Sequence, residues 1–176
     1  MTTATSEQRS TAWFSCLGAP LAAADRLNSR AYLDALGYPP ELPVVSVNTW
    51  QEAERIVRAP DWDSAWWERE QQERDRLKAA AERRLGSTQM LERLTNATDQ
   101  TVDAIHAAAI IAMARTGTGA EAMVRAAAGA AAMAAHEFQL AQLAECGPDH
   151  VFMRKYALFE SGRWPLGVLR GAFYLF

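Results

Sequence analysis

Three long segments with helical periodicity follow one another in the middle of this chain, and only short breaks separate them. They cover about residues 61–85, 88–116 and 119–146. The breaks are Gly86, the loop Gly117-Thr118-Gly119 and the pair Gly147-Pro148, residues that end helices or cannot continue them. Connections this short make neighbouring helices antiparallel. The chain is therefore predicted to fold as a helical bundle.

Shorter elements flank the three long segments. Helical spacing or capping signals predict further helices over about 22–36, 49–59 and 149–160, and residues 41–47 are expected to be an extended strand or a packed loop. The first of these helices is placed on a stripe made of Leu21, Ala24, Leu27, Ala31 and Ala35. Thr49 with Glu52, and Thr118 with Glu121, have the pattern of capping boxes.

The apolar tail, residues 163–176, predicts two short strands around Arg170-Gly171. Because it is apolar on both faces, we expect it to pack against the bundle or against a partner. The predicted fold class is mainly α: an antiparallel helical bundle with a small C-terminal β-hairpin.

Composition narrows the class of protein. The chain has 176 residues, 49% of them hydrophobic, which suits a single helical domain over 11–176 after a flexible N-terminal segment, 1–10. A net charge of -3 gives no general attraction to nucleic acid or to anionic membranes. The apolar run 104–114 is too short to cross a bilayer.

Cellular setting and cofactors are expected from what the sequence lacks. Cys16 and Cys146 have no metal-binding spacing, and no basic segment followed by an apolar stretch opens the chain. We therefore expect a reduced, cytoplasmic setting without a signal peptide. Gly117-Thr118-Gly119 lacks the Lys-Ser/Thr pair of a phosphate loop, and no dinucleotide fingerprint occurs, so we expect no organic cofactor.

Polar residues lie on the predicted helix faces at regular intervals. Asp99, Asp103 and His106 share one face with Ile110 and Met113. His136 lies on a stripe with Met133, Leu140 and Leu143, and Glu70 and Glu73 lie on a third stripe with Trp62, Trp66, Leu77 and Ala81. In antiparallel helices, residues that are equally far from the connecting turn lie at the same height along the bundle, because both helices have the same rise per residue. The polar residues of the three stripes therefore lie at similar heights. If all three stripes face one interior, the six polar residues form one cluster.

An acid/base site is the first functional hypothesis for this cluster. A carboxylate beside a desolvated histidine holds its tautomer and shifts its pKa toward neutrality. His106, assisted by Asp103 or Asp99, would be the base, and His136 or Glu73 the acid. Trp66, Trp67 and Glu70 would bind an apolar organic substrate. The chain would then be an isomerase, cyclase or lyase, without a metal, in a biosynthetic pathway.

Three other hypotheses remain open. The polar residues can simply pair with one another and with arginines such as Arg69, Arg74, Arg76 and Arg125. A mononuclear metal site can use Asp103, His106 and His136; a di-iron site is disfavoured because only half of the required motif is present. A partner-binding or immunity-type protein, or a homodimer, can use the apolar tail as its interface.

Overall fold

The computed structural model describes residues 12–116 and 121–176. Within these ranges the chain forms helices and strands whose bounds are α1 Ala23–Ala35, β1 Val44–Ser46, α2 Trp50–Val57, α3 Ser64–Leu85, α4 Ser87–Thr116, α5 Glu121–Leu143, α6 Val151–Glu160, β2 Pro165–Leu169 and β3 Ala172–Leu175. The mainly α prediction is confirmed, and most helix ends agree with it to within a few residues. The expected N-terminal segment 1–10 and the Gly117-Thr118-Gly119 turn lie outside the described residues.

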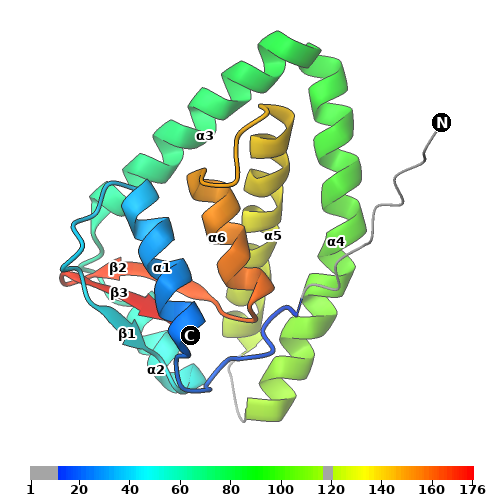
Figure 1. Cartoon of the computed structure of the whole chain (residues 1–176). Coiled ribbons are helices and arrows are strands. Elements are labelled where there is room, and N and C mark those ends of the chain that lie inside the picture. Colours follow the sequence, from blue (N-terminus) through cyan, green and yellow to red (C-terminus); the bar gives the residue numbers. More distant parts are fainter. Residues whose placement is uncertain (1–11, 117–120) are drawn as a thin grey trace.

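The long helices α3 and α4 meet at Gly86 and diverge from it as the two arms of an arch (Figure 1). Helices α5 and α6 lie between the arms, and α1 packs on α6. Helix α4 makes its main contact with α5 rather than with α3. The two larger cavities described below both lie along α5, one against α3, α6 and β2 and the other between α3, α4 and α5.

The sheet packs beside the start of α3 and holds the chain's last residues (Figure 1). The predicted hairpin is confirmed: β2 pairs antiparallel with β3. Strand β1 also joins β3, in parallel, which makes β3 the central strand of a mixed sheet. Phe173 and Phe176 are fully buried in the chain's own core. These two side chains of the tail therefore pack against the rest of the chain, which is one of the two placements expected from the sequence.

Local signals explain several helix starts. The Thr49 hydroxyl accepts a hydrogen bond from the Glu52 N–H at 3.1 Å, as the capping pattern predicts.

The predicted buried stripe of α1 is wrong. Leu27 is 71% exposed, and the buried face carries Asp25, Ser29, Tyr32 and Leu33 instead. No helix among the described residues is long and apolar enough to cross a membrane.

Candidate functional site

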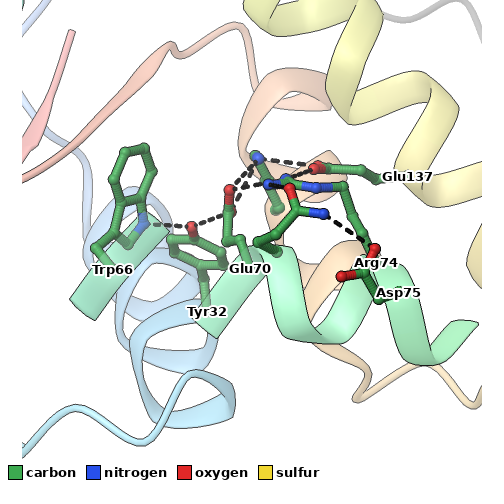
Figure 2. Close-up of polar contacts among 8 residues, drawn as sticks. Tyr32, Trp66, Glu70, Arg74, Asp75 and Glu137 are labelled. Atoms are coloured by element: carbon green, nitrogen blue, oxygen red, sulfur yellow. Dashed lines mark hydrogen bonds and ion pairs between the residues drawn. The ribbon is translucent and has the colours of Figure 1, made fainter. Parts of the chain in front are cut away.

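Four charged side chains from three helices form a buried network. Glu70 and Arg74 lie one turn apart on α3, Glu137 lies on α5 and Lys155 on α6. Lys155 Nζ lies 2.9 Å from Glu70 and 2.8 Å from Glu137 Oε2. Arg74 donates to Glu137 Oε1 at 2.5 Å and lies 3.5 Å from Glu70 (Figure 2). Two carboxylates therefore face two cations, and the network has no net charge.

Tyr32 and Trp66 extend this network toward α1. Tyr32 donates its hydroxyl proton to Glu70 Oε1 at 2.6 Å, and Trp66 Nε1 donates to the Tyr32 oxygen at 2.8 Å (Figure 2). Burial, and then the charge of Glu70, raises the pKa of Tyr32 well above its ordinary value. Tyr32 therefore stays a neutral hydrogen-bond donor.

Lys155, unlike Tyr32, carries a charge although it is buried. Burial alone lowers the pKa of an ammonium group, but the carboxylates of Glu70 and Glu137 outweigh that effect and raise the pKa of Lys155. Its side chain is 10% exposed, while those of Glu70 and Glu137 are 1% and 0% exposed. The arrangement therefore supplies a fixed, protonated ammonium group and a carboxylate at a nearly dry site.

A partly open cavity of ≈ 540 Å³ lies against this network. Glu70, Arg74 and Lys155 contribute its charged wall, and small residues of α5 contribute another. Asp63 and Ser64 also line the cavity. The other lining residues are aromatic or apolar, and they include Trp62, Trp66, Trp67, Phe159, Trp164 and Leu166. A mostly apolar cavity of this size with a few convergent polar groups is typical of a small-molecule site.

Strand β2 of the sheet packs closely against one wall of the cavity. Gly167 of β2 has φ +119, and a Cβ atom there would lie 2.7 Å from the Trp66 ring. Only glycine lets the strand approach the indole this closely. The guanidinium of Arg74 lies 5.0 Å from the centre of the Trp67 ring, which places a cation on that side chain too.

The predicted substrate-binding residues Trp66, Trp67 and Glu70 therefore line one cavity together. The predicted acid/base residues do not join them. Asp99, Asp103 and His106 are exposed on α4, and the expectation that they face the interior is wrong. The buried face of α4 is Met90, Leu94, Ile105, Ala109 and Ala112. The two faces differ by about one residue, or 100°, and an alanine-rich helix has apolar residues on both.

The other predicted site residues lie apart from the charged network. Asp103 and His106 line a groove of ≈ 390 Å³ between α4 and α5, whereas His136 lines a different hollow. Glu73 accepts a hydrogen bond from Arg76 Nε at 2.9 Å and lies 2.6 Å from His150 Nε2. The Arg76 guanidinium, helped by His150 and opposed by burial, keeps the pKa of Glu73 below its usual value.

The hypothesis of a mononuclear metal site finds no ligand set. Asp103 and His106 lie in one groove and His136 in another, as described above. Throughout residues 12–116 and 121–176, no three His, Cys, Asp or Glu side chains are placed to hold a metal ion.

Two of the arginines that were expected to pair with acidic residues do so: Arg125 pairs with Glu121 on the surface, and Arg76 pairs with Glu73.

Sequence reasoning missed Tyr32, Glu137 and Lys155 as members of a site. Lys155 did carry a signal, because it lies at helical spacing between Phe152 and Phe159 on the buried face of α6. Glu137 also carried a signal of burial, because it lies four residues before buried Ala141.

Comparisons with protein families, with curated proteins and with solved structures found no match to this chain.

Proposed function

We propose that this chain binds a small apolar molecule in the tryptophan-lined cavity, with a polar group of that molecule facing the Glu70–Lys155 pair. The observation that carries the proposal is the combination of an aromatic cavity of ≈ 540 Å³ with buried, internally balanced charges on one wall. Apolar walls supply affinity, and a few fixed polar groups supply orientation. A closed, fully packed core would have argued against a ligand.

Gly129 offers a direct test of this cavity. It lines the cavity from α5, and a Cβ atom added there meets nothing within 4 Å. Gly129→Leu should therefore place a bulky side chain in part of the cavity without disturbing the fold. We expect the dye anilinonaphthalene sulfonate to bind the wild-type protein one to one, with enhanced fluorescence. Gly129→Leu should weaken that binding by about tenfold, equivalent to about 1.4 kcal/mol.

The matched control is Ala122→Leu, a change on an exposed position of the same helix outside the cavity. It should leave dye affinity unchanged, and all three proteins should unfold cooperatively in urea. Equal dye affinity in Gly129→Leu and wild type would show that the cavity does not bind the dye. Absence of dye binding to the wild type would count equally against the proposal.

Proton transfer on the bound molecule is the second candidate function, and one observation favours it. Glu70 and Lys155 both line the cavity, so a carboxylate acceptor and an ammonium donor lie side by side against it. They would take the roles first assigned to His106 and His136, in an isomerisation, cyclisation or elimination. Exchange of ligand protons with deuterium oxide, followed by NMR and lost in Glu70→Gln, would support catalysis. Ligand binding without proton exchange would indicate a binding protein and would contradict the catalytic role.

A further inference from the structure

A second hollow adjoins the tryptophan-lined cavity. It has ≈ 630 Å³ and lies between α3, α4 and α5, where Leu91, Leu94 and Leu140 contribute to its wall. Three residues line both hollows: Arg74, Gly129 and Met133. The two spaces therefore adjoin each other at these residues of α3 and α5.

The residues at this junction leave room to pass. Gly129 has no side chain, and the space where its Cβ would lie is empty within 4 Å. Met133 is 44% exposed and unbranched, and such a side chain adapts readily to a neighbour. Arg74 is held in place by its ion pair with Glu137.

The joint space extends along α5. Its walls on α5 run from Ala126 in the first hollow to Leu140 in the second. At the rise of an α-helix this distance is about 20 Å, the length of a long fatty acyl chain. A compact ring system would fill one hollow and leave the other empty.

We propose that the two hollows form one groove that binds a long aliphatic chain of the kind that fatty acids carry, crossing between Gly129 and Met133. The inference rests on the proposed function, because the polar end of the ligand would face the Glu70–Lys155 pair in the tryptophan-lined cavity. The aliphatic part of the ligand would then lie in the second hollow, where Leu91, Leu94 and Leu140 contribute to the wall.

Calorimetric titration with palmitate and octanoate, each below its micelle concentration, tests this groove. Palmitate should bind the wild-type protein at least about tenfold more tightly than octanoate, because only the longer chain buries apolar surface in both hollows. Leu91 is 56% exposed and lines the second hollow only. Leu91→Glu should reduce palmitate affinity to the octanoate level and leave dye binding unchanged.

The control is Ile111→Glu, the same kind of change on the same helix, at a residue that is 66% exposed and lines neither hollow. It should alter neither palmitate nor dye binding. Equal binding of palmitate and octanoate, or equal effects of Leu91→Glu and Ile111→Glu, would contradict the proposal of a joint groove. Dye binding would in that case still support the proposed ligand site in the tryptophan-lined cavity. If neither the fatty acids nor the dye bind, the proposed function fails, and this inference fails with it.

Discussion

At the scale of single residues, the four charged side chains of the buried network depend on one another. Lys155 contacts both Glu70 and Glu137, and Arg74 contacts the same two carboxylates. Each buried ion is costly to remove from water, and the cost is offset only while all partners are present. The network is therefore balanced but intolerant of partial loss.

Removal of Lys155 tests that balance. Lys155→Met leaves two buried carboxylates with one cation, so we expect the free energy of unfolding to fall by about 3–5 kcal/mol. Urea denaturation followed by circular dichroism measures the change. The neighbouring Arg154→Met breaks only a surface pair with Asp149 and should cost at most about 1 kcal/mol. Adding Glu137→Gln to Lys155→Met should recover part of the loss; equal stability of Lys155→Met and wild type would contradict the balance.

At the scale of elements, α3 and the hairpin together build the cavity wall. Helix α3 contributes Trp66, Trp67, Glu70 and Arg74 from its first half, and β2 packs Gly167 against the Trp66 ring. The periodicity of α3 correctly predicted Glu70, Leu77 and Ala81 on its buried face. The close approach of a strand to Trp66 is a tertiary contact that periodicity does not contain.

A pair of glycine variants in the hairpin separates backbone strain from contact with the indole. Gly167→Ala places a Cβ atom 2.7 Å from Trp66, whereas Gly171, with φ +71, has nothing within 4 Å of such an atom. Both variants place a Cβ atom on a left-handed backbone, which lowers the free energy of unfolding by about 1–2 kcal/mol. Only Gly167→Ala should also displace Trp66 and weaken dye binding. Equal dye affinity in the two variants would remove Gly167 from its role in shaping the cavity.

At the scale of the whole molecule, pH couples to stability through the same network. Tyr32 and Lys155 both have pKa values raised by folding. The folded protein then holds protons that the unfolded chain releases near its ordinary values of about 10. The stability that these two groups contribute is complete below about pH 10 and is lost as pH rises through their raised pKa values.

Urea midpoints measured from about pH 8 to about pH 11 should therefore fall at the alkaline end. Tyr32→Phe removes one of the two groups, so the alkaline decline should be shallower in this variant than in the wild type. A wild-type midpoint that rises with pH, or an identical slope in Tyr32→Phe, would show that Tyr32 is not held protonated by its contact with Glu70.

The sequence by itself determined the order, type and approximate limits of the helices and the hairpin. Glycine and proline breaks, the Thr49 cap and the long periodic segments act through bonds between near neighbours, so they can be identified without knowing the fold. Tertiary structure alone decided which faces meet. Because alanine is apolar and small on every side of α4 and α5, local pattern does not distinguish faces that are about 100° apart. Packing turned Asp103 and His106 outward and brought Lys155 into contact with both Glu70 and Glu137. Helical spacing indicates that Lys155 and Glu137 are buried, but it does not indicate which partners they meet.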